Sequence, residues 1–320
     1  MVTGGAGYIG AHASLLLAER GDHVVILDDL VTGSAARVAT IPLVQHDLAG
    51  GNARQVVAQT LQEHRIDSVI HFAARKQVAE SIRLPAWYFQ QNVGGLANLL
   101  LGMEDAGVSR LVFSSSAAVY GDANGVVSER HETRPVNPYG ETKLVGEQLI
   151  AAASRAWGLR ATSLRYFNVG GAGRPELGDT AALNLIPIVF ERLAAGEPPV
   201  IFGDDYLTPD GTCVRDYVHV VDVAEAHLAV LDSLTKVAGH LTLNIGTGIG
   251  TSVREMTAAL ATVAGSDISP VVRDRRPGDP ASVVAAVHDI QQRTGWAATR
   301  SLAEIVESAW KSRQHAIAAN

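Results

Sequence analysis

The chain of 320 residues has a single cysteine and no long uninterrupted apolar run. One cysteine, Cys213, excludes an intramolecular disulfide and a metal site built from several cysteines, and we expect it to be structural. No segment reaches the roughly eighteen apolar residues of a membrane span, and no secretory leader is visible, so we expect a cytoplasmic protein without a membrane partner. The net charge of −7 leaves no basic face for nucleic acid.

Histidine is present, but in no metal-binding pattern. The 11 histidines are scattered without H-x-x-x-H or a similar spacing, so we predict no metal site. His71 and His219 each lie beside apolar strand residues. We therefore expect both to be hydrogen-bonded groups of the core rather than ligands.

Residues 1–168 alternate apolar strand segments with helical ones. We expect strands at 24–27, 43–46, 69–72, 110–113 and 161–166, and helices at 11–18, at 87–101 and after Pro138. Buried strands separated by helices are typical of a parallel sheet that is covered on both faces. We predict an α/β fold in which residues 1–168, with a return at about 218–240, form a Rossmann-type doubly wound parallel sheet. Residues 169–320, which include a helix at 185–195, are predicted to form mainly a smaller C-terminal α/β substrate-binding domain.

Gly4, Gly7 and Gly10 form a G-x-x-G-x-x-G motif between the first strand and a helix. Such glycines permit a tight turn, close approach of a pyrophosphate to the backbone, and close packing of the helix on the sheet. Asp28 ends the next strand, roughly twenty positions on, where a carboxylate accepts from the adenosine ribose and disfavours a 2′-phosphate. The motif therefore predicts NAD rather than NADP, with Asp47 as a weaker candidate for the adenine edge. Because only three residues precede Gly4, we expect a short first strand or a natural start upstream.

Tyr139 and Lys143 lie four residues apart on the helix that Pro138 introduces. Residues at this spacing share a helix face, so we expect the lysine charge to lower the pKa of the phenol and make it a general base. The strand at 110–113 delivers three consecutive serines, of which Ser116 would offer a second hydroxyl to the same substrate oxygen. With the glycine motif, these residues indicate a nicotinamide enzyme that moves a proton and a hydride at one carbon.

The motifs resemble those of the extended short-chain dehydrogenase/reductase family, over essentially the whole chain. The segments that carry the resemblance are Thr3–Gly10, Val69–Ala74, Phe113–Asp122, Arg165–Asn168 and Gly211–Tyr217. The resemblance implies that the catalytic residues are Ser116, Tyr139 and Lys143. It also implies, together with the glycine motif, that NAD is contacted by Gly4, Gly7, Tyr8, Ile9, Gly10, Asp28, Asp47, Leu48, Phe72, Ala73, Ala74, Lys76, Asn92, Tyr139, Lys143 and Tyr166.

A UDP-sugar is the substrate that the resemblance implies. Its expected contacts are Ser116, Tyr139, Asn168, Asn184, Leu185, Arg215, Arg276, Asp279 and Val283. The two arginines suit a diphosphate, because a guanidinium can donate two hydrogen bonds at once to such a group. The loop at 173–182, which would cover the pocket, is short for the family.

The resemblance further implies an isomerase that forms a homodimer and converts UDP-galactose to UDP-glucose. The 4-hydroxyl would be inverted through a transient 4-keto sugar, with NAD regenerated in every cycle. A nucleotide-sugar 4,6-dehydratase or decarboxylase is an alternative, but both need an acidic side chain where this chain has Ala117 and Ala118. A non-catalytic NAD-sensing protein is a third possibility, although it would have little reason to keep Ser116, Tyr139 and Lys143 together.

Substrate breadth is predicted from the position four residues beyond Asp279. In the family this residue lies beside the sugar 2-position, where a large aromatic side chain excludes an N-acetyl group. Here it is Val283, with Ser282 next to it, so either register leaves a small side chain. We therefore expect N-acetylated UDP-hexosamines to be accepted as well.

Overall fold

A parallel sheet of seven strands organises the larger part of the molecule. The computed structural model describes residues 1–179, 181–276 and 278–318, so the predicted lid at 173–182 and the segment around Asp279 each contain one residue, Thr180 or Pro277, outside the described residues. The strand order is β11-β7-β5-β4-β1-β2-β3. The strands are β1 (Val2–Thr3), β2 (Ile26–Asp28), β3 (Leu43–Gln45), β4 (Val69–His71), β5 (Arg110–Ser114), β7 (Arg160–Tyr166) and β11 (His240–Ile245).

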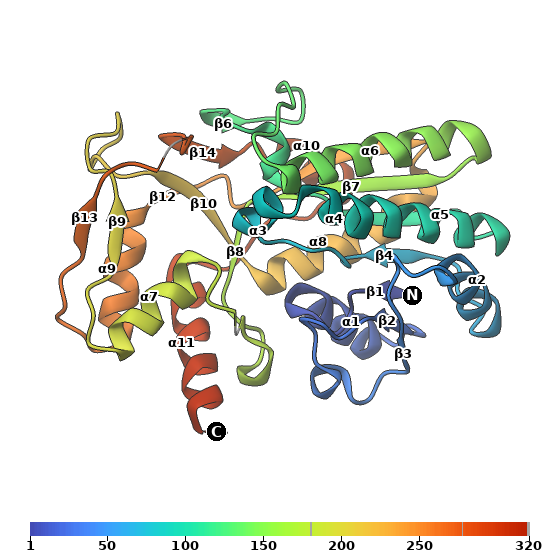
Figure 1. Ribbon diagram of the computed structural model, residues 1–320, viewed down its shortest axis with the longest axis horizontal. Coiled ribbons are helices and arrows are strands. Elements are labelled where there is room, and N and C mark those ends of the chain that lie inside the picture. The colour runs from blue at the N-terminus through green and yellow to red at the C-terminus, as the bar shows by residue number, and fades with distance from the viewer. Residues whose placement is uncertain (180, 277, 319–320) are drawn as a thin grey trace.

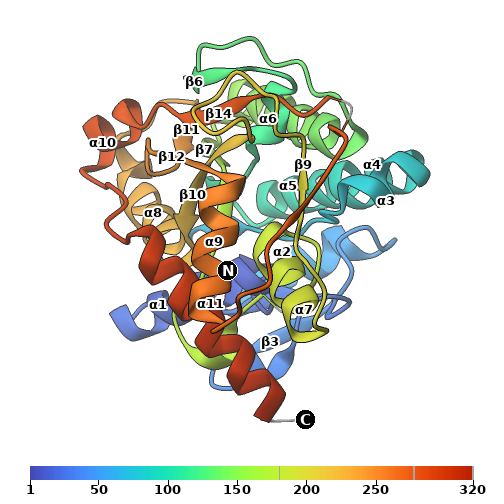
Figure 2. The ribbon, with the colours of Figure 1, turned by 90° about the vertical axis from the view of Figure 1, so that its left-hand side faces the viewer.

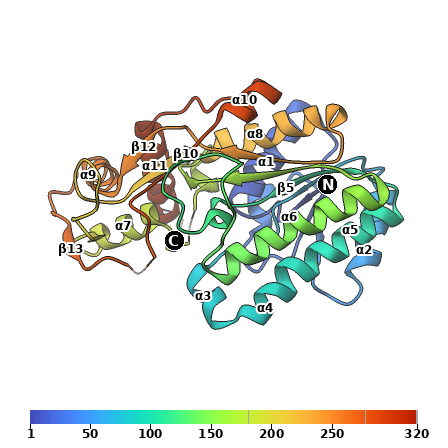
Figure 3. The same ribbon diagram turned by 90° about the horizontal axis from the view of Figure 1, so that it is seen from above.

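Helices cover both faces of this sheet, because its strands are apolar on both sides. The helices α1 (Tyr8–Arg20), α8 (Val220–Ser233) and α10 (His288–Thr294) pack on one face, where Leu17, Val223 and Ile290 belong to one buried cluster. The helices α2 (Ala53–Glu63), α5 (Gly95–Asp105) and α6 (Pro138–Trp157) cover the other face. Figures 1 and 3 show the sheet between these two layers. The predicted Rossmann-type α/β fold is confirmed.

A smaller part of the molecule is built around β10 (Val214–His219). The strands β12 (Gly250–Ser252), β14 (Ser282–Ala285) and β8 (Asn168–Gly170) pair with β10, and β6 (Gly125–Val127) pairs with β14. The helices α7 (Leu185–Ala194), α9 (Val253–Val263) and α11 (Leu302–Ala318) share a buried cluster beside this sheet, and β9 (Val200–Phe202) pairs with β13 (Val271–Arg273). Figure 2 shows these elements facing the viewer.

The chain crosses between the two sheets more than once. β6 comes from the first half of the chain but pairs with β14 in the smaller sheet, whereas β11 comes from the second half and completes the larger one. The segment at about 218–240, which was predicted to return to the larger domain, contains α8. The strand β11 begins where this segment ends. Sequence patterns missed this strand because an edge strand of mixed polar and apolar residues resembles a loop.

Local departures from the expected elements are small. β1 comprises only two residues, in agreement with the short run before Gly4. The helix expected at 87–101 consists of α4 (Pro85–Phe89), a π-helical turn (Gln90–Gly94) and α5, and a short helix α3 (Val78–Arg83) precedes it. Short 3-10 turns lie at Ala35–Val38, Ala117–Tyr120, Pro175–Leu177 and Leu234–Lys236.

The described residues contain no candidate membrane span and no candidate metal cluster. None of their helices combines the length and the apolar character needed to cross a membrane. Among the same residues, no group of three or more histidine, cysteine, aspartate or glutamate side chains could hold a metal ion. Cys213, His71 and His219 are buried, and both histidines are hydrogen-bonded as expected.

Candidate active site

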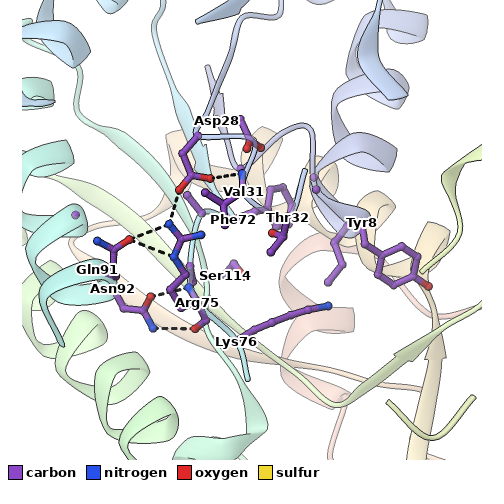
Figure 4. Close-up of a pocket in the computed structure, with 18 of the residues that line it drawn as sticks. Tyr8, Asp28, Val31, Thr32, Phe72, Arg75, Lys76, Gln91, Asn92 and Ser114 are labelled. Carbon is purple, nitrogen blue, oxygen red and sulfur yellow. Dashed lines mark hydrogen bonds and ion pairs between the residues drawn. The ribbon is translucent and has the colours of Figure 1, made fainter. Parts of the chain in front are cut away.

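A cleft of about 310 Å³ opens at the carboxyl ends of the strands of the larger sheet. Loops that follow parallel strands meet at this edge, which is where ligands bind in open α/β sheets. Every residue predicted to contact NAD lines this cleft. Figure 4 shows part of the lining, with Tyr8 and Lys76 on one side and Asp28, Gln91 and Asn92 on the other.

The glycine loop leaves room for the pyrophosphate of a dinucleotide. A side chain at Gly10 would bring its Cβ within 2.1 Å of the Gly4 carbonyl oxygen, and Gly4 itself has φ +68°. At Gly7 the nearest atom to an added Cβ is that same oxygen, at 3.2 Å, so the rest of the space there is open. Helix α1 then begins with no side-chain cap and no acidic residue in its first turn. Its first N–H groups are therefore free to bind phosphate, and the residues present fit a dinucleotide.

Asp28 is held in place by the backbone around it. One carboxylate oxygen accepts from the Ala6 N–H at 2.9 Å, and the other accepts from the Leu30 N–H at 2.8 Å. Burial raises the pKa of this carboxyl, while these two hydrogen bonds oppose the change. Each oxygen keeps a second lone pair that can accept from a ribose hydroxyl. Nearby, Asp47 is exposed and caps the Ala49 N–H, whereas Leu48 is buried.

Asn92 lies on the π-helical turn and contacts the loop after β4. Its amide oxygen accepts from the Arg75 N–H at 2.8 Å, and its amide nitrogen donates to the Arg75 carbonyl at 3.0 Å and to Thr142 Oγ1 at 3.0 Å. Asn92 thus supports the wall of the cleft that carries Arg75 and Lys76. Sequence reasoning missed Arg75, Asp29 and Gln91, which also line the cleft. Their position directly beside Lys76, Asp28 and Asn92 was the available signal.

The three serines follow β5 but have different surroundings. Ser114 forms a very short hydrogen bond with Tyr166, and its carbonyl accepts from Lys143 Nζ at 2.7 Å. Ser115 is fully buried and donates to Glu147 at 2.5 Å. Ser116 caps the following 3-10 turn by accepting from the Ala118 N–H at 3.1 Å. Its hydroxyl also lowers the pKa of the Tyr139 phenol, although burial outweighs this effect.

Tyr139 and Lys143 share a face of α6, as their spacing predicts. Asn137 caps the helix by accepting from the Gly140 N–H at 2.9 Å, and Pro138 occupies the first turn. Lys143 is 4% exposed, and its Nζ lies 5.9 Å from the centre of the Tyr139 ring. Burial lowers the pKa of Lys143 to about 7, although the charge of Glu147 opposes this.

The expected lowering of the Tyr139 pKa is wrong for the protein by itself. Burial raises the pKa of the phenol, and only the hydrogen bond with Ser116 works in the other direction. The prediction assumed that the lysine charge would act mainly on the phenol. Instead, Lys143 donates to the Ser114 carbonyl. Burial also disfavours its protonated form, so the lysine carries its positive charge less fully than an exposed lysine does.

Several of the residues predicted to contact the sugar nucleotide lie on β10 or on strands that pair with it. Arg215 on β10 pairs in register with Val283 on β14, and its guanidinium approaches Asp279 at 3.5 Å. Arg276 lies over the ring of Phe202, 3.9 Å from its centre. Asn168 begins β8, next to β10, where it is exposed.

Asn184 and Leu185 stand at the start of α7, whose next residue, Ile186, packs against Gly170 on β8. Asn184 precedes the helix and donates to Asp179 at 2.8 Å, while Asp179 lines the cleft. Of the residues predicted to contact the sugar nucleotide, only Tyr139 lines the cleft itself. Those that do not are Ser116, Asn168, Asn184, Leu185, Arg215, Arg276, Asp279 and Val283.

The sequence and the fold were compared with known proteins. The model of the NAD dependent epimerase/dehydratase family matches residues 1–246. A UDP-glucose 4-epimerase of Azospirillum brasilense is 43% identical over 302 residues, which are 92% of this chain and 86% of the relative. A crystal structure of the UDP-glucose 4-epimerase from Stenotrophomonas maltophila, with bound NAD and formylated UDP-arabinopyranose, has a TM-score of 0.94 and 41% identity and covers 100% of this chain and 98% of that one. The UDP-Glc/GlcNAc 4-epimerase from Campylobacter jejuni has a TM-score of 0.86 and 35% identity, with 98% of each chain covered.

Proposed function

Because this chain belongs to the NAD dependent epimerase/dehydratase family, we propose that it interconverts UDP-galactose and UDP-glucose, with NAD as its bound cofactor. The observation that carries the proposal is that Tyr139 and Lys143 line the same cleft as the glycine loop and Asp28. A proton acceptor for a hydroxyl and a dinucleotide site are thereby brought to one cavity.

Each group in the cleft has a definable task. NAD, when bound, supplies the centre that takes a hydride from C4 of the sugar and later returns it to the opposite face. Tyr139 accepts the proton of the 4-hydroxyl and gives it back when the alcohol is re-formed. Ser116, whose hydroxyl lowers the pKa of Tyr139, would orient the same oxygen. Lys143, anchored on the Ser114 carbonyl, places its amino group on the same helix face as the phenol.

The sugar nucleotide is proposed to lie along β10 and β14. Arg215 and Arg276 supply positive charge for the diphosphate, and Asn168 supplies an amide for a sugar or phosphate oxygen. Residues 169–320 would in this way provide most of the substrate-binding part, and residues 1–168 most of the cofactor-binding part. The 4-keto sugar, held only through its UDP, can then turn over in the pocket before it is reduced.

A dehydratase or decarboxylase remains disfavoured by the residues after Ser116. Ala117 and Ala118 occupy the 3-10 turn beside Tyr139, and methyl groups cannot transfer protons. Among the described residues, the acidic side chains that line the cleft are those of Asp28, Asp29, Asp47, Glu80 and Asp179, and none of them occupies the positions directly after Ser116.

Turnover of UDP-galactose by the purified protein tests the proposal. The phenol of Tyr139 is the proton acceptor, so Tyr139→Phe should lower kcat by about 10²–10⁴-fold while the protein still binds NAD. Tyr88→Phe is the matched control, because Tyr88 is buried outside the cleft lining and bonds to Glu80 at 2.9 Å. Wild-type turnover in Tyr139→Phe would contradict the assignment.

We also propose that the protein is a homodimer. The family resemblance supports this state, and α3 and α5, which both contact α6, each expose an apolar side chain: Ile82 is 62% exposed and Leu101 is 39% exposed. The mass in solution, from sedimentation equilibrium over a range of concentrations, decides between monomer and dimer.

A further inference from the structure

An ion pair between Arg75 and Asp29 lies in the wall of the cofactor cleft. The Arg75 guanidinium approaches the Asp29 carboxylate at 2.5 Å, and the two side chains are only 14% and 24% exposed. Both residues line the cleft. Figure 4 shows the guanidinium between the end of β2 and Gln91, with Lys76 pointing away.

The two residues of this pair come from the loops after two different strands of the sheet. Asp29 directly follows β2, and Arg75 lies in the loop after β4. In the sheet, β1 runs between these two strands and is parallel to both. The ion pair therefore spans the carboxyl end of β1, where the glycine loop begins. Since the acid at the end of β2 marks the adenosine side of a dinucleotide site, the pair lies at the adenosine end of the cleft.

Arg75 is fixed on its side of the cleft by hydrogen bonds to Asn92 and Gln91. Its N–H and its carbonyl are both hydrogen-bonded to the Asn92 side chain, at 2.8 and 3.0 Å. Its guanidinium donates twice to Gln91, at 3.1 and 3.0 Å, and lies 5.5 Å from the centre of the Trp87 ring. The π-helical turn Gln90–Gly94 presents the adjacent Gln91 and Asn92 to the same residue. Such turns commonly occur at functional sites.

Asp29 is fixed on the opposite side. Its second carboxylate oxygen accepts from the Val31 N–H at 3.0 Å, and this shapes the loop after β2. Asp28, the neighbouring residue expected to bind the ribose, feels both charges of the pair: Asp29 raises the pKa of its carboxyl and Arg75 lowers it. The two loops are thus joined directly above the residue that is expected to bind the adenosine ribose.

We propose that the Arg75–Asp29 pair is a clasp that slows the release of NAD from the adenosine end of the cleft. The inference rests on the NAD-dependent function proposed above. The clasp opens to admit the cofactor and closes again between the loops after β2 and β4. A cofactor that is regenerated in every cycle has no need to leave, so slow release keeps the enzyme loaded between turnovers.

The test measures NAD release rather than activity. Wild type, Arg75→Leu and Asp29→Asn are loaded with radiolabelled NAD and chased with unlabelled NAD. Breaking an interaction of this kind acts mainly on the dissociation rate, and we expect each variant to release NAD about tenfold faster. The double variant should release it no faster than the faster single variant, because both substitutions remove one interaction. Asp29→Asn keeps an oxygen that can accept from Val31.

Arg54→Leu is the matched control. Arg54 pairs with Asp105 at 2.6 Å, on α2 and α5, and neither residue lines the cleft. NAD release from this variant should equal that of wild type, and all variants should unfold at similar temperatures without cofactor.

The outcomes separate the clasp from the function itself. Unchanged release from both Arg75→Leu and Asp29→Asn, in a wild type that binds NAD, overturns the clasp. Faster release accompanied by a clearly lower unfolding temperature than in Arg54→Leu also overturns it, because a loosened fold would then be the cause. A wild type that binds no NAD contradicts the proposed function instead.

Discussion

At the scale of single residues, the proposed base is poorly activated by its own protein. Burial raises the pKa of Tyr139 and lowers that of its neighbour Lys143 to about 7. The free protein therefore stores a neutral phenol beside a lysine that is close to losing its charge. A further positive charge in the cleft would stabilise the phenolate, since an opposite charge within a few ångströms favours the ionised form. The base is thus expected to become active only in the cofactor complex.

Val283 is the residue for which substrate breadth can be tested. It lies on β14 opposite Arg215 and packs against the cluster of Val119, Tyr120 and Phe167, next to the turn after Ser116. A valine there leaves space beside the proposed sugar site. We expect wild type to convert UDP-N-acetylglucosamine as well as UDP-glucose, and Val283→Tyr to lose the N-acetylated substrate selectively. Overpacking costs about 1–3 kcal/mol, so the ratio of the two kcat/KM values should change by roughly 5- to 150-fold.

Ser282→Tyr is the control for this comparison. Successive strand residues point to opposite faces, so a tyrosine at Ser282 adds similar bulk on the other side of β14. Kinetics with both substrate pairs give the ratio for each variant. If wild type does not convert the N-acetylated sugar, or if Val283→Tyr leaves the ratio of the two kcat/KM values unchanged, another wall residue sets the size of the pocket.

At the scale of elements, a buried ion pair joins α6 to β7 behind the proposed catalytic residues. Arg165 donates to both carboxylate oxygens of Glu147, at 2.9 and 2.5 Å, and Ser115 donates to the same carboxylate. The side chains of the pair are 6% and 5% exposed. Glu147 lies one turn beyond Lys143, so this contact fixes the helix that carries Tyr139 against the strand next to β5.

Glu147→Gln should be strongly destabilising. The substitution keeps the shape but leaves the Arg165 charge buried without a counter-charge, and breaking such a pair typically costs about 3–5 kcal/mol. Glu197→Gln is the control, since Glu197 pairs with Arg192 at 3.3 Å near the surface, where a pair contributes at most about 1 kcal/mol. Urea unfolding gives the free energy of unfolding of both variants. Equal small losses would mean that Arg165 finds another partner or water.

The π-helical turn is the second element that organises the site. Its adjacent residues Gln91 and Asn92 both contact Arg75, Gln91 through the guanidinium and Asn92 through the backbone. The same turn lets Asn92 also contact Thr142 on α6. One local irregularity thereby links the cofactor wall to the helix of the proposed base.

At the scale of the whole molecule, buried neutral histidines tie the parts together. His12 on α1 accepts from the Gly173 N–H at 2.9 Å, and His219 at the start of α8 bonds to Ser308 on α11 at 3.0 Å. Burial lowers the pKa of His12, His219 and His227 to about 4 and that of His71 to about 3. All four are therefore uncharged in the native state at neutral pH.

These histidines should make the protein sensitive to acid. Between about pH 6.5 and pH 4 the unfolded chain binds protons that the native state excludes, so stability falls as pH falls through this window. Each histidine contributes a loss of about 1.4 kcal/mol per pH unit there. Urea unfolding at several pH values measures the slope. His227→Leu should reduce it, while His288→Asn, at an exposed position, should leave it unchanged. A stability that is flat from pH 7 to pH 5 would contradict the neutral assignments.

Local sequence signals determined one part of this protein, and contacts between distant residues determined the other. The glycine motif, Asp28, the serines and the Tyr139–Lys143 spacing are local signals, because strand and helix periodicity alone decides which edge or face a residue occupies. The fold class and the NAD cleft followed from those signals. Other lining residues, such as Leu48, Lys76 and Asn92, followed from the family resemblance. Only the tertiary structure decided which distant groups meet: Arg75 with Asp29, Lys143 with the Ser114 carbonyl, and β11 with β7. It also decided the direction of the Tyr139 pKa, because desolvation depends on everything packed around the ring and leaves no trace in the spacing of residues along the chain.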